Sequence, residues 1–323
     1  MVGLSRRSVA AKSRPTHRSP LGLSFIGRKM HRLLDRQVHP SPYIAQRSRT
    51  GGCRISVRLA CGGTPLVKIA TWNINSITSR IGHVLGWSAK NRPDVLCLQE
   101  TKCVDARFPL AKLRSAGFDH IAFHGEKSYN GVAILSRYPI LDVHKNFPGD
   151  ATDAPRRLIA ATINGMRIVN TYVPHGTAFG TDKFKFKLDW LERLRRYFDD
   201  NFDRDDSLLL CGDLNVAPHE TDVWNPRLWS DKMHFSKPER EALLNLKRWG
   251  FVDVFRQMNE ESGEYSWWDY FHHSFEKNRG LRIDHIWTSP PLAELCSDCW
   301  IDRGPRALEK PSDHAPVVAN FSV

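Results

Sequence analysis

The chain has 323 residues, 41% of them hydrophobic, which is enough for one large domain or two small ones. Residues 1–67 carry the whole net charge of +12, because they contain thirteen Lys and Arg and a single acid, Asp35. The remainder of the chain is neutral, which excludes a uniformly basic nucleic-acid-binding domain. No stretch approaches the roughly 20 apolar residues of a membrane span, so we expect no membrane partner.

Residues 1–66 are rich in Arg, Ser, Pro and Gly and show no sustained hydrophobic period. Such a segment cannot bury enough apolar area to offset its ordering entropy, so we predict a disordered basic N-terminal extension. The composition also fits an organelle transit peptide, which would make the protein organellar. Alternatively, translation starts near Val67 and the segment is absent.

The seven cysteines are an odd number, and several lie inside apolar runs. We therefore expect reduced, mostly buried thiols and a cytoplasmic protein, part of a bacterial nucleoid-associated pool. Cys296 and Cys299 have the spacing of half a zinc site, but no second pair accompanies them, so structural cysteines are favoured.

From Val67 onward, short apolar runs alternate with helical patterns. Apolar spacing predicts helices over 77–92, which Pro93 ends, over 184–198, and over 236–249, which Ser236 and Glu239 open with capping-box spacing. Asn164-Gly165 predicts a hairpin turn. The predicted strands are Val67–Trp72, Val95–Gln99, 131–136, Leu158–Ile163, Arg167–Val173, Leu208–Cys211, Arg282–Thr288 and Pro316–Phe321. Hairpins mixed with helices predict an α/β sandwich.

Four carboxylate-bearing segments each lie at the end of an apolar run, where buried strands would deliver them to a shared rim. Mg²⁺ prefers oxygen ligands from a few carboxylates and leaves room for phosphate. A neutral His beside such a metal can act on the phosphate or on its attacking water. The pattern therefore predicts a metal-dependent phosphodiesterase. The segments carry Glu100, Asp213 with Asn215, Asp284 with His285, and Asp313 with His314.

Two of these acids also have a structural interpretation. Glu100 could pair with Lys102 rather than with a metal, because an acid directly after a buried strand needs a partner. Asp213 and Asn215 point the same way if the strand continues, which suits a general base beside a water-orienting amide. An Asx turn is the alternative for this pair.

Three further positions leave alternatives open. Asn73 follows the first strand and could orient a metal ligand or only cap a turn. Tyr172 ends its strand and could bond a phosphate oxygen or belong to the core. Either Asp284 or Asp313 could accept a hydrogen bond from His314 and so set its tautomer.

Basic and aromatic residues interleave in two places, which suits binding of a phosphate backbone with stacking on bases. Residues 183–187 fit a charged helix face equally well. The aromatics from Trp267 to Phe271, followed by Lys277, Arg279 and Arg282, indicate a binding loop.

Taken together, seven ordered motifs make residues 68–323 resemble the exodeoxyribonuclease III family of apurinic/apyrimidinic endonucleases, within the endonuclease/exonuclease/phosphatase superfamily. The resemblance implies a four-layer αββα sandwich of two mixed sheets flanked by helices, with 67–323 as the catalytic domain. It implies Mg²⁺, with Mn²⁺ as a substitute, and cleavage 5′ to abasic sites with 3′–5′ exonuclease and 3′-end trimming, in base excision repair. The partner would be double-stranded DNA with abasic sites or 3′ ends, bound by a monomer. The motifs are 72–75, 98–102, 131–135, 212–215, 266–270, 278–284 and 310–316.

The same resemblance implies roles for single residues. Asp213 would activate the water, Tyr172 would contact the scissile phosphate, and His314, oriented by Asp284, would bind that phosphate or the metal. Asn215 would help to hold the transition state. The implied metal ligands are Asn73, Glu100, Asp213, Asn215, Asp313 and His314, and the implied substrate-binding residues are Trp267, Arg279 and Arg156. His175 departs from the Asn or Gln usual in relatives and receives no role.

Two other functions remain possible on the residues alone. A phosphodiesterase of the same superfamily could act on a small or lipid phosphate, but segment 266–282 resembles the DNA-repair branch. A DNA-binding protein with a dead site is the other, and the complete set of polar site residues disfavours it.

Overall fold

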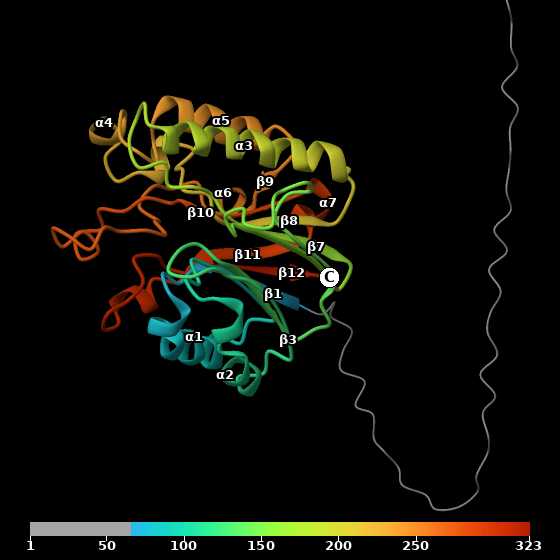
Figure 1. Ribbon diagram of the computed structural model, residues 1–323. Helices are drawn as coiled ribbons and strands as arrows, with labels where there is room; N and C mark the ends of the chain where they lie inside the picture. The colour runs from blue at the N-terminus through green and yellow to red at the C-terminus, as the bar shows by residue number, and fades with distance from the viewer. Residues whose placement is uncertain (1–65) are drawn as a thin grey trace, which may run out of the picture. The chain divides into compact units, whose positions relative to one another are not determined.

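The computed structural model describes residues 66–323, so the extension predicted over 1–66 lies outside the described residues except for Leu66. Within the described part, two six-stranded mixed sheets stack face to face, and helices cover both outer faces (Figure 1). The predicted four-layer αββα sandwich is thereby confirmed.

The first sheet unites strands from both ends of the described chain. Its order is β11-β12-β1-β2-β4-β3, and only β1 and β2 within it run parallel. Its strands are β1 (Leu66–Asn73), β2 (Val95–Gln99), β3 (His120–His124), β4 (Val132–Ser136), β11 (Cys296–Ile301) and β12 (Val317–Ser322).

The second sheet has the same plan, with one parallel pair at its centre. Its order is β5-β6-β7-β8-β10-β9, and the parallel strands are β7 and β8. Its strands are β5 (Leu141–Lys145), β6 (Leu158–Ile163), β7 (Met166–Tyr172), β8 (Leu208–Asp213), β9 (Val252–Asp253) and β10 (Asp284–Thr288).

Helices α1 and α2 lie against the first sheet, and α3 and α5 against the second (Figure 1). The α-helices are α1 (Ile77–Asn91), α2 (Leu110–Ser115), α3 (Asp182–Asn201), α4 (Pro226–Trp229), α5 (Lys237–Lys247), α6 (Val254–Met258) and α7 (Pro290–Glu294). Short 3₁₀ helices are η1 (Asp105–Arg107), η2 (Glu220–Asp222) and η3 (Gly304–Ala307). None of the helices in 66–323 is both long and apolar enough to span a bilayer.

Three apolar layers hold the sandwich together. Aliphatic side chains such as Ile69, Ile168 and Ile286 fill the space between the sheets. Large aromatics fill the outer layers, with Trp72 beneath α1 and Trp190 on α3. Each fully buried side chain of this size contributes about 1.5–3 kcal/mol relative to exposure, so the sheets form one rigid support for the loops at their edge.

Local sequence signals predicted most of these elements. The turn at Asn164-Gly165 has positive φ at both residues, as a tight hairpin requires, and the capping box of Ser236 and Glu239 opens α5. The predicted strand at Arg282 begins two residues later, at Asp284, and the Arg282 side chain lies in a buried ionic network. Strands β3, β5, β9 and β11 were not predicted; all five residues of β5 are exposed, so it carries no buried apolar run.

Parallel pairing brings the polar strand ends to one place. β1 and β2 pair in register from Ile69 with Val95 to Asn73 with Gln99, so that Glu100 follows directly beside Asn73. In the second sheet, Tyr172 pairs with Asp213, and Asp213 pairs with Asp284 of antiparallel β10. The carboxyl ends of both parallel pairs therefore converge at one edge of the sandwich.

Candidate active site

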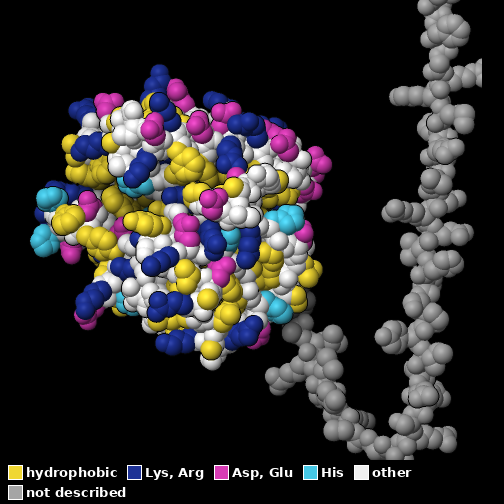
Figure 2. Space-filling model, viewed as in Figure 1, with side chains coloured by type: hydrophobic (Ala, Val, Ile, Leu, Met, Phe, Trp, Pro, Cys, Tyr) yellow, Lys and Arg dark blue, Asp and Glu magenta, His cyan; other side chains and the backbone are white. Residues whose placement is uncertain are grey.

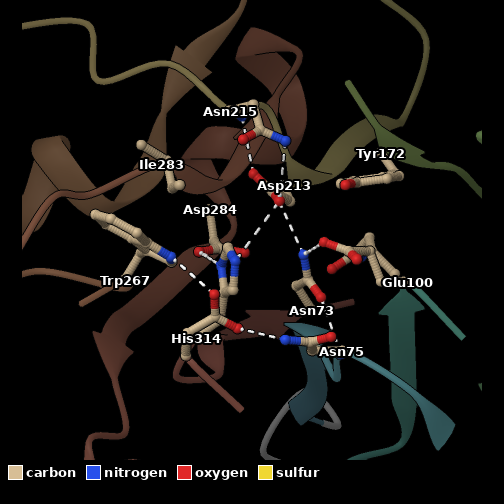
Figure 3. Close-up of polar contacts among 12 residues, drawn as sticks. Asn73, Asn75, Glu100, Tyr172, Asp213, Asn215, Trp267, Ile283, Asp284 and His314 are labelled. Atoms are coloured by element: carbon tan, nitrogen blue, oxygen red, sulfur yellow. Dashed lines mark hydrogen bonds and ion pairs between the residues drawn. The ribbon is translucent and has the colours of Figure 1, made fainter. Parts of the chain in front are cut away.

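Two carboxylates face each other across the gap between the sheets (Figure 3). The Asn73 amide nitrogen donates to Glu100 Oε1 and to Asp213 Oδ2, both at 2.9 Å. The Asn73 amide oxygen accepts from the Asn75 backbone N–H at 3.0 Å. Asn73 therefore bridges the two carboxylates through its amide nitrogen. In this orientation its amide oxygen accepts from the Asn75 backbone, whereas its predicted role would need that oxygen to bind a metal.

His314 is oriented by Asp284 and not by Asp313, which decides between the two predicted partners. His314 Nδ1 lies 2.8 Å from Asp284 Oδ2, and Nε2 lies 3.8 Å from Asp213 Oδ2 (Figure 3). Because a carboxylate only accepts, Nδ1 carries a proton and Nε2 faces the gap. Burial lowers the pKa of His314, but Asp284 first, and then Asp213 and Asp313, raise it to about 10.

Asp213 is surrounded by donors. Its Oδ1 accepts from the Asn215 backbone N–H at 2.8 Å, and its Oδ2 accepts from the amides of Asn73 and of Asn215, the latter at 3.2 Å. The predicted Asx turn and the predicted neighbouring amide are thus the same arrangement. Burial raises the pKa of Asp213 to about 7, although the positive charge of His314 opposes this shift.

The alternative partner of Glu100, Lys102, is present in the structure. Its carboxylate is 2.6 Å from Lys102 Nζ while also accepting from Asn73. Burial would raise the pKa of Glu100, but Lys102, Asn73 and His314 together outweigh it and hold that pKa below its ordinary value. Glu100 is therefore a carboxylate near neutral pH.

The Tyr172 hydroxyl points into the same gap (Figure 3), and an arginine that the sequence did not indicate lies on its ring. The guanidinium of Arg157 is 4.5 Å from the Tyr172 ring centroid and donates to the Tyr172 carbonyl at 3.2 Å. Burial, followed by the charges of Glu100 and Asp213, raises the Tyr172 pKa well above its ordinary value. Tyr172 thus keeps its proton as a donor.

Arg156, which was predicted to bind substrate, is directed elsewhere. Its guanidinium donates to the carbonyl of Gly125 and lies 3.7 Å from Asp105. Arg157 extends β6 opposite Tyr172, whose N–H donates to the Arg157 carbonyl at 2.8 Å. Since successive side chains in extended backbone point to opposite faces, only the second arginine of the pair reaches Tyr172.

Trp267 and Asp313 form a neighbouring wall of the site. Trp267 Nε1 donates to Asp313 Oδ2 at 3.1 Å, while Asp313 Oδ1 accepts from the Asn75 amide at 3.0 Å (Figure 3). Asp313 is thereby committed to Trp267 and Asn75, and does not join the group of carboxylates between the sheets. The ring of His234 lies 5.8 Å from that of Trp267, so a second imidazole borders this wall.

Only part of the predicted binding loop is exposed, because Trp268 and Arg282 are buried in the interior. Tyr270 and Phe271 are among the large hydrophobic residues that remain exposed. Arg279 is exposed and stacks on Trp224 at 5.1 Å, outside the polar group at the sheet edge. On the face shown in Figure 2, lysine and arginine side chains are scattered among apolar side chains.

A basic hollow of about 440 Å³ adjoins the site on the side of Glu100. It is lined by Thr78, Lys102, Cys103, Val104, Arg107, Lys127 and Ser128. Its three cationic side chains make it suited to an anionic group of a substrate.

Three side chains could hold a metal ion. One ligand atom each from Glu100, Asp213 and His314 lies within 4.8 Å of the other two, and no other such group of His, Cys, Asp and Glu occurs in 66–323. Cys296 and Cys299 are free, buried cysteines of β11. Two hard carboxylates in such proximity favour a divalent cation with oxygen ligands.

Comparison with known proteins agrees with this geometry. The sequence profile of the Endonuclease/Exonuclease/phosphatase family matches residues 70–314. Exodeoxyribonuclease III of Haemophilus influenzae is 35% identical over 267 residues, which cover 79% of this chain and 100% of the relative.

Two solved structures are similar at higher identity. An AP endonuclease from Archaeoglobus fulgidus is 42% identical with a TM-score of 0.77, covering 80% of this chain and all of that one. A 3′ phosphatase from Neisseria bound to a product DNA hairpin is also 42% identical, with a TM-score of 0.76, covering 79% of this chain and 99% of that one.

Proposed function

Because the chain belongs to the exodeoxyribonuclease III family of the endonuclease/exonuclease/phosphatase superfamily, we propose that it is a metal-dependent DNA phosphodiesterase of base excision repair. It cleaves the strand 5′ to abasic sites, degrades DNA from 3′ ends and removes 3′ blocking groups. The relatives support the three activities, since one is an exodeoxyribonuclease III, one similar structure is an AP endonuclease, and another is a 3′ phosphatase bound to product DNA.

One observation carries the proposal. The Asp284–His314 pair and the Glu100–Asp213 carboxylates arise from four distant segments, yet their reactive atoms meet within a few ångströms. A purely DNA-binding surface needs no such convergence of buried acids and an imidazole. The arrangement is what hydrolysis of a phosphodiester requires, because it places a base, an acid and a cation site around one phosphate.

The metal we propose is Mg²⁺, with Mn²⁺ as a substitute. Glu100 and Asp213 would supply the oxygen ligands, since both approach the same amide nitrogen of Asn73 and would otherwise repel each other. When bound, the cation neutralises phosphate charge and acidifies a bound water. His314 fits the phosphate better than the cation, because the neighbouring carboxylates raise its pKa to about 10, so Nε2 carries a proton and can donate to a phosphate oxygen.

The protein's own groups then divide the chemistry. Asp213 takes the proton of the attacking water, and Asn215 holds that carboxylate through its backbone and side-chain N–H groups. His314 Nε2 and the Tyr172 hydroxyl donate hydrogen bonds to the phosphate oxygens while the water oxygen bonds to phosphorus and the P–O3′ bond breaks, and the leaving O3′ takes a proton from solvent. Both Asn215 amide hydrogens are used, one by Asp213 and one by the Val173 carbonyl, so Asn215 orients the base.

DNA would lie across the edge of the two sheets. We propose that the hollow beside Lys102 receives backbone phosphates, and that the exposed Tyr270 and Phe271 contact the bases. Trp267 and Ile283 would border the sugar at the cleavage site (Figure 3), a position that an abasic nucleotide reaches at small cost because its base is missing. Arg279 and Arg156 remain proposed contacts of the outer DNA backbone.

The site is built within one chain, so we propose a monomer acting on chromosomal DNA in the cytoplasm. Sedimentation of the purified protein with and without a short duplex tests the oligomeric state; a dimer in both conditions contradicts it.

An assay of the full-length protein tests the function. Three duplexes are needed: one with a tetrahydrofuran abasic analogue, one with a 3′ phosphate at a nick, and one with a recessed 3′ hydroxyl. Each is incubated with Mg²⁺, with Mn²⁺ or with EDTA. We expect hydrolysis with either metal and none with EDTA. Turnover of inositol phosphates without hydrolysis of any duplex would overturn the proposal.

A further inference from the structure

A fully buried ion pair lies behind the active site. Lys187 projects from α3 and Glu239 from the first turn of α5, and neither side chain is exposed to solvent. Lys187 Nζ donates to Glu239 Oε1. The two helices that cover the second sheet are thus joined by charge at a point that solvent does not reach.

Lys187 also holds the loops that follow β7 and β8. Its Nζ donates to the Asn215 carbonyl at 2.8 Å and to the His175 carbonyl at 3.2 Å. With Glu239 as the third acceptor, all three ammonium hydrogens have partners. Lys187 therefore ties together the segments that leave Tyr172 and Asp213.

Glu239 fixes the other side of the same loop. Its Oε2 caps α5 by accepting from the Ser236 N–H and hydroxyl, while its Oε1 also accepts from the His234 N–H at 3.0 Å. His234 Nδ1 lies 2.8 Å from the Asn215 carbonyl. The Asn215 carbonyl thus accepts from both Lys187 and His234, one on each lone pair.

These bonds act on a residue in a strained conformation. Asn215 has φ +54°, in the left-handed region, and from there its backbone N–H and its side-chain amide both reach Asp213. Two donors on its carbonyl hold this conformation. A buried ion pair contributes little net stability compared with an apolar pair of similar volume. Its effect here is to fix positions, because each ammonium hydrogen of Lys187 is bonded to a different acceptor.

We infer that Lys187 and Glu239 are positioning residues for catalysis: the pair holds the Asn215 loop so that Asn215 keeps the Asp213 carboxylate in its reactive orientation. The inference rests on the proposed function and extends it to residues that lie outside the gap between the sheets. Neither residue touches the gap between the sheets, so the pair acts on turnover and not on DNA binding.

The test removes both charges at once, so that no buried charge is left without a partner. Lys187→Met/Glu239→Gln is compared with Lys237→Met/Glu241→Gln, which alters an exposed Lys–Glu pair on α5. On the abasic duplex with Mg²⁺, we expect kcat to fall about 10- to 100-fold in the buried double variant, as for other small misplacements of catalytic groups. KM and the melting temperature should stay close to wild type, and the surface variant should be unchanged.

A double-mutant cycle separates positioning from general damage. In an Asn215→Ala background, the buried double substitution should cost little further kcat, because the side chain it positions is absent. Equal losses in both backgrounds, or wild-type kcat in a folded double variant, would overturn the inference. If the double variant does not fold, Glu239→Gln alone is the test, with a smaller loss of kcat expected and wild-type kcat as the contradicting result. An inactive wild-type protein would instead overturn the proposed function.

Discussion

The contacts of the candidate site converge on a single residue, Asp213. Three N–H groups donate to its two oxygens, and His314 Nε2 lies 3.8 Å from Oδ2. These contacts fix the position of the carboxylate at the gap between the sheets. The function of the site therefore depends on the charge of this side chain more than on its volume.

Replacing Asp213 with Asn tests that dependence. Asn keeps the shape but cannot take a proton, so we expect abasic-site cleavage to fall about 100- to 10,000-fold while DNA affinity stays near wild type. Single-turnover cleavage and a gel-shift titration measure the two quantities. Asp205→Asn, at an exposed position, is the control. Wild-type turnover in the Asp213 variant would exclude Asp213 as the base.

Glu100 is the carboxylate that the first sheet contributes. Removing it in Glu100→Ala leaves Asp213 as the sole acid among the three candidate ligands. We expect the Mg²⁺ concentration for half-maximal activity to rise about tenfold or more, the effect typical of weakened metal ligation. A titration of activity against Mg²⁺ measures it, and an unchanged midpoint would show that Glu100 is not a ligand.

At the scale of elements, β10 is held by a buried ionic network at its first residues. Arg282 pairs with Asp222 of η2 at 2.7 Å and with Asp253 of β9 at 2.7 Å. It also donates to His285 Nδ1 at 3.0 Å, while His285 Nε2 donates to the Val216 carbonyl at 3.1 Å. The network fixes the segment that carries Asp284, and it requires a neutral His285.

This requirement predicts how stability depends on pH. Burial, and then the adjacent Arg282, lower the pKa of His285 to about 3, below the roughly 6.5 of an unfolded chain. The unfolded chain therefore gains a proton at a higher pH than the folded protein, so stability is lost as pH falls from about 6.5 toward 3. For His285 alone the loss between pH 7 and pH 5 is about 2 kcal/mol.

Urea unfolding at pH 7 and pH 5 measures this contribution. His285→Gln can keep both hydrogen bonds but does not titrate, so its stability should fall less than that of wild type by about that amount. Other titrating groups act in both proteins and cancel in the comparison. Identical pH dependence in the two proteins would show that folding does not lower the pKa of His285.

For the whole molecule, the basic residues are unequally distributed. The excess of thirteen Lys and Arg over one acid in residues 1–67 accounts for the net charge, and the rest of the chain is neutral. Every residue of the candidate site lies in the described part. We therefore predict that residues 1–67 add long-range electrostatic attraction to DNA without taking part in the chemistry.

Deleting residues 1–66 tests this division. At saturating DNA we expect turnover on a short abasic duplex to stay near that of the full chain, because the site is retained. DNA affinity at low salt should fall and depend less steeply on salt, since fewer phosphates are neutralised. Fluorescence anisotropy at several salt concentrations and steady-state cleavage measure the two effects. A loss of folding or turnover would mean that the segment is part of the catalytic domain.

The sequence by itself determined the strands and helices with strong local signals. Apolar runs marked the central strands, Asn164-Gly165 marked a hairpin, and Ser236 with Glu239 marked the start of α5. It also determined that polar groups follow these strands, and the motifs around them determined the family. These features depend on residues that are close together in the sequence, so they can be recognised without the tertiary structure.

Only the tertiary structure decided which of these groups meet. It selected Asp284 over Asp313 as the partner of His314, and placed Arg157 instead of Arg156 on Tyr172. It also joined Lys187 to Glu239, two residues 52 positions apart. Such pairings depend on strand register and on how the sheets and helices pack, because a shift of one residue turns a side chain to the opposite face.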